Sequence, residues 1–139
     1  MANQLYLPAK ESFLKGEIAL NTGVIVAYLI DSADYTFSSA HQFLSSVPAG
    51  ARVGGPITLA SKTTTNGVFD AADITFPSAT GDQSEVCILV QQSAPAGGSA
   101  LAESAQRLIA YLDTATGLPV TPSGGNIVGA WNASGIFGL

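Results

Sequence analysis

Residues 24–30 read VIVAYLI, an apolar run built almost entirely from β-branched, aliphatic and aromatic side chains. Residues of this kind favour a buried strand of a pleated sheet. The run is also far shorter than the roughly 20 residues that a membrane-spanning helix needs. Two later runs have the same character, EVCILV at 85–90 and RLIAYLD at 107–113. We therefore expect a buried strand at 24–30 and further strands at the two later runs.

Turn-forming residues separate the other strand-like segments. ITLASKTT (57–64) and VFDAADITF (68–76) are joined through Asn66–Gly67, a strong hairpin signal because both residues tolerate positive φ. A second turn, SATGD, leads into SEVCILVQQ (84–92), so these three segments form a plausible antiparallel meander. The last strands expected are NIVGAW (126–131) and GIFGL (135–139).

Short strands at near-regular spacing are typical of all-β proteins. Residues 1–139 are accordingly predicted to form a single β-rich domain, an antiparallel β-sandwich or barrel-like fold with one or two short helices.

The first helix is expected in YLPAKESFLKG (6–16), where Pro8 suits the first helical position and Gly16 the left-handed position after the end. We expect Phe13 and Leu14 to face the core, with the charged side chains of this segment facing solvent. One or two further helical turns are expected at 40–44, with Ser38 or Ser39 as N-cap and Pro48 as the stop.

The exterior carries unusually few charges. Only 11% of the residues are charged, whereas roughly 25% is typical. A charge-poor surface favours association, so we expect much of it to be covered by neighbouring subunits, although a secreted Ser/Thr-rich β-protein would look similar. The five cations are scattered, which argues against nucleic-acid binding; they are Lys10, Lys15, Arg52, Lys62 and Arg107.

The first residues lack the pattern of a signal peptide, and no run is long enough to span a membrane.

Catalytic patterns are weak, and we expect no enzyme. The single histidine, His41, has no nucleophile-elbow sequence to serve, so a structural or surface role is the better interpretation. Cys87 lies in the run at 85–90 and is expected to act as a small buried hydrophobe. One cysteine and one histidine exclude a Cys/His metal site.

Carboxylates occur twice at matched spacing, as Asp31 with Asp34 and as Asp70 with Asp73. Such pairs could act as acid and base in glycoside cleavage or could ligate calcium. Because both lie at strand ends, where Asp commonly bonds backbone amides, turn formation is favoured. The remaining acids near strand ends are interpreted in the same way; they are Asp82, Glu85 and Asp113. The glycines of ARVGGPIT and PSGGNIV precede strands rather than helices, so they are assigned to turns. No catalytic, cofactor-binding or metal-binding residue, and no cofactor, is assigned.

The sequence allows more than one interpretation of each of two long loops. SAPAGGSALAESA (93–105) is the best candidate for a mobile loop, although ALAESAQ could form a short helix. DTATGLPVTPSGG (113–125) is interpreted as a stiff connector rather than a ligand loop. Pro119 and Pro122 fix φ and remove two amide donors, which suits an extended edge segment, and Gly124–Gly125 suit a tight turn into the next strand. Asp113 is expected to accept bonds from a turn at 114–117.

Several segments in order carry a resemblance to a known family. They are MANQLY, SFLKGEI, VIVAYLID with YTFSSAHQFLSSVPAGARV, LASKTTTNGVFDAADITFPSATGDQSEVCILV, and LIAYLDTATGLPVTPSGGNIVGAWNASGIFGL. Together they cover most of the chain, and LIAYLDTATGLPVTPSGG is the most specific. The chain thus resembles short virion structural proteins of tailed bacteriophages. It departs from that pattern in an alanine-rich stretch at 91–107 and in its ending at 132–139, where contacts with partners are often made.

The resemblance implies a non-enzymatic virion structural protein. We expect a capsid decoration, or cement, protein that binds junctions between major capsid subunits, with the major capsid protein and copies of itself, as a trimer, for partners. It would reside in the phage capsid after assembly in the host cytoplasm, without nucleic-acid or membrane partners. The alternatives are a small tail, baseplate or fibre component, or a carbohydrate-binding adhesion module with Tyr35, Phe37 and Trp131 as a platform. Core packing is the better interpretation of Trp131.

Overall fold

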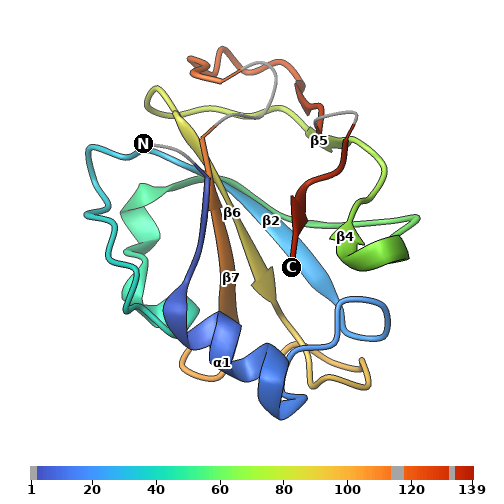
Figure 1. The fold of residues 1–139 in the computed structure, drawn as a ribbon. Coiled ribbons are helices and arrows are strands. Elements are labelled where there is room, and N and C mark those ends of the chain that lie inside the picture. The colour runs from blue at the N-terminus through green and yellow to red at the C-terminus, as the bar shows by residue number, and fades with distance from the viewer. Residues whose placement is uncertain (1–2, 114–117, 132–133) are drawn as a thin grey trace.

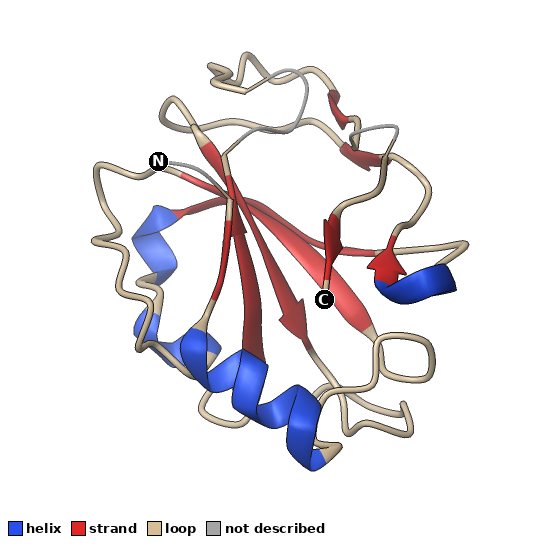
Figure 2. Ribbon diagram, in the orientation of Figure 1, coloured by secondary structure: helices blue, strands red, loops and turns tan. Residues whose placement is uncertain are grey.

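The computed structural model describes residues 3–113, 118–131 and 134–139. The described chain is mostly β, with one five-stranded antiparallel sheet, two two-stranded sheets and one short α-helix (Figure 1; Figure 2). The strands are β1 (Gln4–Leu5), β2 (Ile25–Ile30), β3 (Arg52–Thr58), β4 (Val68–Phe69), β5 (Ile74–Phe76), β6 (Val86–Gln91), β7 (Arg107–Leu112), β8 (Ile127–Gly129) and β9 (Phe137–Gly138). The helix is α1 (Leu7–Lys15), and the 3₁₀ turns are η1 (Leu44–Ser46), η2 (Ala49–Ala51) and η3 (Thr65–Gly67). The prediction of an antiparallel β-rich fold is confirmed.

The three apolar runs form the middle of the main sheet, whose strand order is β1-β7-β6-β2-β3. β6 pairs with β2 along its whole length, from Ile25 opposite Gln91 to Ile30 opposite Val86. All residues of β2 and β6 are buried, as are five of the six residues of β7. Because side chains alternate across a strand, this continuous burial means that both faces of the sheet are covered.

Different parts of the chain cover the two faces. On the face that carries Tyr28 and Tyr111, the covering chain lies between β2 and β3, and the ring of Phe37 packs 4.4 Å from that of Tyr111. On the other face, the Phe76 ring of β5 lies against Gly54 of β3, where a Cβ would come within 2.9 Å of it. Figure 1 shows the first cover on the left, and β4, β5 and the C-terminal segment on the right.

The helix has the predicted ends, but one side chain is placed differently. Pro8 occupies the first turn, and Gly16 ends α1 in the left-handed conformation at φ 75°. Ala9 and Ser12 face the core and Phe13 is half-buried, whereas Leu14 is 90% exposed. The prediction that Leu14 faces the core is wrong because the helix turns its small residues toward β7, which places Leu14 on the opposite side.

The predicted meander is only partly right. Asn66 and Gly67 do adopt positive φ, at 55° and 78°, but Thr63 and Asp70 form the one bridge across that turn among the described residues. β3 pairs with β2, β4 with β9 and β5 with β8, so strands distant in sequence replace the expected neighbours. The predicted helical turns at 40–44 are displaced too, since the 3₁₀ turns begin at Leu44 and Ala49.

The main sheet is open rather than closed into a barrel, with β1 and β3 at its two edges. Each edge is poorly suited to adding a strand from another chain. β1 has two residues, while β3 contains Pro56 and pairs with β2 through irregular register near Leu29. Any association of the described chain is therefore expected to use side-chain surfaces. No helix among the described residues is long and apolar enough to cross a membrane.

Candidate functional site

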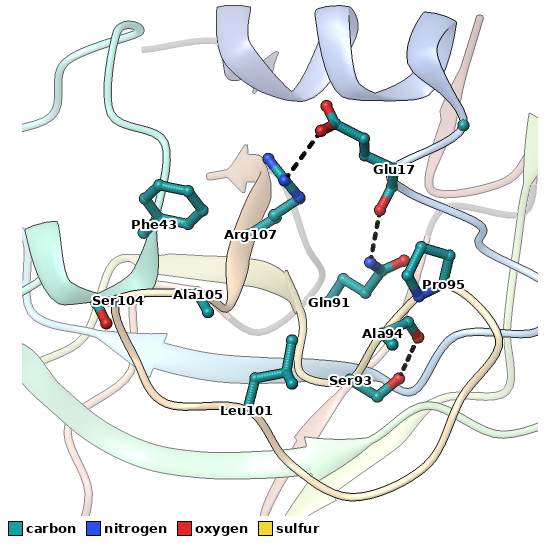
Figure 3. Close-up of a pocket in the computed structure, with 11 residues that line it drawn as sticks. Glu17, Phe43, Gln91, Ser93, Ala94, Pro95, Leu101, Ser104, Ala105 and Arg107 are labelled. Carbon is teal, nitrogen blue, oxygen red and sulfur yellow. Dashed lines mark hydrogen bonds and ion pairs between the residues drawn. The ribbon is translucent and has the colours of Figure 1, made fainter.

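A pocket of about 400 Å³ lies between the end of α1, β7 and the loop at 92–106 (Figure 3). Its polar lining includes Glu17, Gln91, Ser93 and Arg107, and the apolar lining includes the ring of Phe43. The guanidinium carbon of Arg107 lies 5.4 Å from the centre of the Phe43 ring, a cation–π contact. A concave site that combines an apolar wall with a few polar groups is the kind of place where small ligands bind.

The polar groups of this pocket are engaged within the protein. Arg107 donates to Ser12 Oγ and to the Glu17 carboxylate, both at 3.2 Å. Gln91, which is 2% exposed, accepts from the Ala19 amide and donates to the Glu17 carbonyl, both at 2.9 Å. Ser93 Oγ accepts from the amide of Val24 and donates to the Ala94 carbonyl. The pocket therefore anchors α1 and the loop at 92–106, and its described lining places no base beside a nucleophile.

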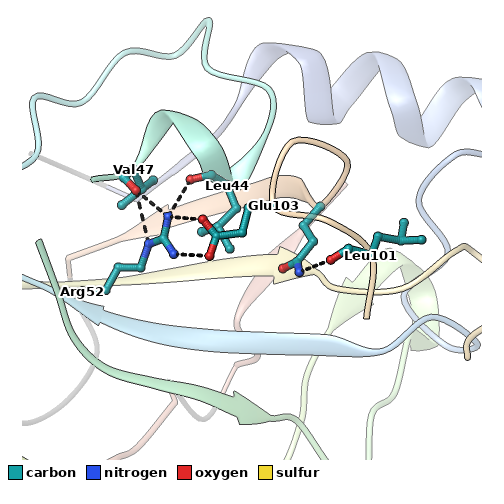
Figure 4. Close-up of polar contacts among 6 residues, drawn as sticks. Leu44, Val47, Arg52, Leu101 and Glu103 are labelled. Atoms are coloured by element: carbon teal, nitrogen blue, oxygen red, sulfur yellow. Dashed lines mark hydrogen bonds and ion pairs between the residues drawn. The ribbon is translucent and has the colours of Figure 1, made fainter. Parts of the chain in front are cut away.

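The loop that we considered mobile is held at several points (Figure 4). Glu103 accepts two hydrogen bonds from Arg52, at 2.8 and 3.0 Å, and its backbone carbonyl accepts from the amide of Ser45. Gln106 donates through its side chain to the Leu101 carbonyl at 2.7 Å. Residues 103–105 form a turn and no helix, so the short-helix alternative is wrong.

His41 takes part in a chain of hydrogen bonds with two tyrosines. Its Nδ1 lies 2.7 Å from the Tyr35 hydroxyl, which in turn lies 3.0 Å from the hydroxyl of Tyr6. With the proton of neutral His41 on Nε2, Tyr35 donates to Nδ1 and accepts from Tyr6, so both buried hydroxyls are satisfied. Burial raises the pKa of Tyr6 and of Tyr35 above the usual tyrosine value. The arrangement locks the chain between β2 and β3 onto the sheet, in keeping with a structural role for His41.

The carboxylates at the turn after β2 gather with one that the spacing did not suggest. Oxygens of Asp31, Asp34 and Asp82 lie within 4.8 Å of one another. Asp31 is buried and accepts the amide of Ala33 at 2.9 Å, the turn bond that we predicted, whereas Asp34 and Asp82 are exposed. Among the described residues, these three carboxylates are close enough together for their oxygens to contact one hard cation such as Ca²⁺. The Asp82 partner was missed because it reaches the cluster from the loop before β6.

Relief of repulsion in this cluster should stabilise the isolated protein. We expect Asp34→Asn to raise the free energy of unfolding by up to about 1 kcal/mol, because Asp34 is exposed and its charge faces two others. Urea titrations at low salt measure the difference, which should shrink at high salt. Asp73→Asn serves as a comparison that removes a charge outside the cluster; a gain for Asp73→Asn equal to that for Asp34→Asn would contradict the repulsion.

The second acidic pair accepts backbone hydrogen bonds, a local one at Asp70, as predicted for a turn, and a long-range one at Asp73. Asp70 Oδ1 accepts from the Ala71 amide and Asp73 Oδ1 accepts from the Trp131 amide. The Trp131 indole donates to the Ala72 carbonyl at 3.1 Å, and the ring packs partly buried against the core. The predicted packing of Trp131 is confirmed, and its bonds to Asp73 and Ala72 hold the end of β8 beside β5. The predicted bonds from a turn at 114–117 to Asp113 lie outside the described residues.

The connector before β8 behaves as an extended edge segment where it is described. Val120 exchanges two backbone hydrogen bonds with Ser84, at 2.7 and 2.8 Å. Gly124 has a φ of 89° and the chain bends at 124–125, where the turn into β8 was predicted. The Gly124 amide donates to the Ala79 carbonyl. Cys87 is 3% exposed, and burial raises the pKa of its thiol to about 12, so it packs as the small hydrophobe that we expected.

Apolar side chains, by contrast, remain exposed at separate places. Leu7 and Leu14 stand on α1, Val128 on β8 and Leu139 at the last residue. Leu139 borders a groove of about 340 Å³ whose wall is mostly apolar and includes Phe13, Phe69 and Phe137. These surfaces offer contact area rather than reactive groups.

Comparison with known proteins adds no relative. No protein-family model matches the chain, and no curated protein sequence matches it.

Proposed function

We propose that the protein is a non-enzymatic structural component of a bacteriophage virion, a capsid decoration protein that binds junctions between major capsid subunits. Its partners are then the major capsid protein and further copies of itself, and its place is the surface of the phage capsid. The proposal starts from the resemblance of the sequence to short virion proteins of tailed phages and from the scarcity of surface charge.

The single observation that carries the proposal is how polar and apolar side chains are used. Polar side chains that line the pocket at Arg107 form hydrogen bonds within the protein. Large apolar side chains are instead exposed to solvent on α1, on β8 and at Leu139. Apolar area that is gathered in one place, as at Leu7 and Leu14 on α1 and at the groove beside Leu139, suits contact with neighbouring proteins. Catalysis would need the reverse, with free polar groups converging in a pocket.

The mechanism is association. A specific contact between proteins buries roughly 1,600 Å² of total surface, and a small domain set at a junction can make more than one contact. Each contact lowers the free energy of the assembled shell relative to separated subunits by mass action. The hydrogen-bonded loops around Arg52 and Arg107 keep the contact surfaces in one conformation, which reduces the entropy lost on binding.

Phage particles that lack the protein should release their DNA at a lower temperature than complete particles. Dye-accessible DNA measured during a heating ramp gives the release temperature, and adding the purified protein back should restore it. Gly50→Ala serves as the control variant for add-back, because a Cβ on Gly50 would meet nothing within 4 Å. Equal release temperatures with and without the protein would rule out the decoration role.

A tail, baseplate or fibre location is the main alternative within the virion, and copy number separates the two. Hundreds of copies per particle indicate the capsid, whereas a few dozen or fewer indicate the tail. The carbohydrate-binding alternative has weaker support, because Tyr35 is 3% exposed and Trp131 packs beside β5 rather than next to Tyr35. Glycan-array binding that is lost on Trp131→Ala would favour it.

A further inference from the structure

The solvent side of α1 is unusual for a surface helix. Leu7 and Leu14 are 54% and 90% exposed, and their spacing of seven residues places them on one side, two turns apart. Lys10 lies between them, and Glu11 and Lys15 flank them as an ion pair. We call these five exposed residues the α1 face. It combines apolar area with an excess of one positive charge.

The cations of the chain are otherwise engaged. Four of the five have partners among the described residues: Lys15 with Glu11, Arg52 with Glu103, Lys62 with the Gly23 carbonyl and Arg107 with Glu17. The ion pairs of the described residues do not include Lys10. The α1 face therefore carries the one described cation that is available to another molecule.

An excess of negative charge lies at the other end of the central strands. Three carboxylates gather there within 4.8 Å of one another, and the carboxylate of Glu85 beside them accepts from Ser32. We call Asp31, Asp34, Asp82 and Glu85 the acidic end. None of these four residues takes part in the ion pairs of the described chain.

The two surfaces lie at opposite ends of the same strands. The segment after α1 is held near the start of β2, because the Ala19 amide donates to the Gln91 side chain and Gln91 pairs with Ile25. Asp31 instead follows Ile30, the last residue of β2. Six residues of strand, about 20 Å, separate them. Figure 1 shows α1 below the strands and the start of β6 above. Within one copy the two surfaces cannot meet.

We infer that the α1 face docks on the acidic end of a second copy of this chain, in a head-to-tail contact. The occupant is a second copy because each surface supplies the charge that the other lacks. A head-to-tail contact repeats, and it closes into a ring when the rotation between copies allows it. A nine-residue helix offers less area than a standard interface, so the contact is weak singly and depends on ionic strength. The inference deepens the proposed function and rests on its claim that copies bind one another.

Cross-linking between copies tests the contact directly. Leu14→Cys and Ala33→Cys are both exposed, leave every charge in place, and put one thiol on each surface. Under mild oxidation the mixture should form mixed disulfide dimers in clear excess over dimers of either variant alone, and added salt should suppress them. Val128→Cys mixed with Ala33→Cys is the matched control, since Val128 is also exposed but lies on β8. The native Cys87 is buried and should not contribute.

Charge exchange gives the second measurement. Lys10→Glu added to the Leu14→Cys chain should slow mixed cross-linking about tenfold, and Asp34→Lys added to the Ala33→Cys chain should restore it. Circular dichroism verifies that each variant is folded. Three results would each overturn the contact: mixed dimers no more abundant than in the Val128→Cys control, a dominant dimer of Leu14→Cys with itself, or no recovery on charge exchange.

Failure of this contact and failure of the decoration role are distinguishable. Capsid binding is measured with particles that lack the protein, whereas cross-linking uses the purified chain alone. Normal capsid binding without head-to-tail cross-links would leave the decoration role standing and remove the copy-to-copy contact. Cross-links without capsid binding would support the copy-to-copy contact and rule out the decoration role.

Discussion

Replacing Gly55 with alanine is expected to lower the free energy of unfolding by about 3 kcal/mol. Gly55 lies in β3 at a φ of 99°, a conformation that side chains with a Cβ rarely adopt. A Cβ there would also lie 2.4 Å from the Ala27 carbonyl oxygen and 3.1 Å from Tyr28 Cα. Both neighbours are backbone atoms of β2, so the strand pair itself must shift.

The measurement is a urea titration followed by circular dichroism, with Gly50→Ala as the matched control. Gly50 lies in η2, just before β3, where its φ is not in the left-handed region and a Cβ would meet nothing within 4 Å. That variant should stay within about 0.5 kcal/mol of the parent protein. Similar losses for the two variants would show that the close approach of β3 to β2 is not what constrains Gly55.

The second large effect is expected at Arg52, whose replacement by alanine should cost about 3 kcal/mol. The guanidinium donates to the Val47 carbonyl through two nitrogens, at 2.6 and 3.2 Å, and to the Leu44 carbonyl at 3.2 Å. It also lies over the Tyr28 ring and is only 12% exposed. Alanine would remove the guanidinium donors from the Val47 carbonyl, leave the Leu44 carbonyl with the Val47 amide as donor, and expose Tyr28.

Glu103→Ala separates the two halves of this contact. Glu103 is 55% exposed, so losing its carboxylate should cost less than about 1 kcal/mol, well below the loss for Arg52→Ala. Arg52→Lys should lie between the two, because lysine keeps the charge but cannot bond Val47 and Glu103 together. Denaturant titrations of the three variants give this order, and equal losses for Arg52→Ala and Glu103→Ala would show that the carboxylate, not the carbonyls, matters.

The same contact has a defined dependence on pH. The hydrogen bonds from Arg52 hold the pKa of Glu103 below the ordinary glutamate value of 4.5. Because the folded-state pKa is the lower one, the contribution of this ion pair to stability is present above that ordinary value and is lost as the pH falls through the folded-state pKa. The difference between Glu103→Ala and the parent protein should therefore shrink in acid.

The sequence determined the parts of this protein that depend on short stretches of chain. The runs at 24–30, 85–90 and 107–113 predicted the three buried strands, because a continuous β-branched and aromatic pattern leaves no polar face for a helix or a loop. Pro8 and Gly16 predicted both ends of α1, since each residue restricts or permits φ by itself. Low charge predicted a surface suited to association, though not where contacts are made.

Only the tertiary structure decided which segments meet. The chain folds β3 onto β2 rather than into the predicted meander, and it brings Asp82 to Asp31 and Glu103 to Arg52 across 51 residues in each case. It also places Leu14 outward, because α1 turns Ala9 and Ser12 to the sheet. Such pairings depend on how all strands share two crowded sheet faces, a free-energy balance over the whole chain that no local pattern records.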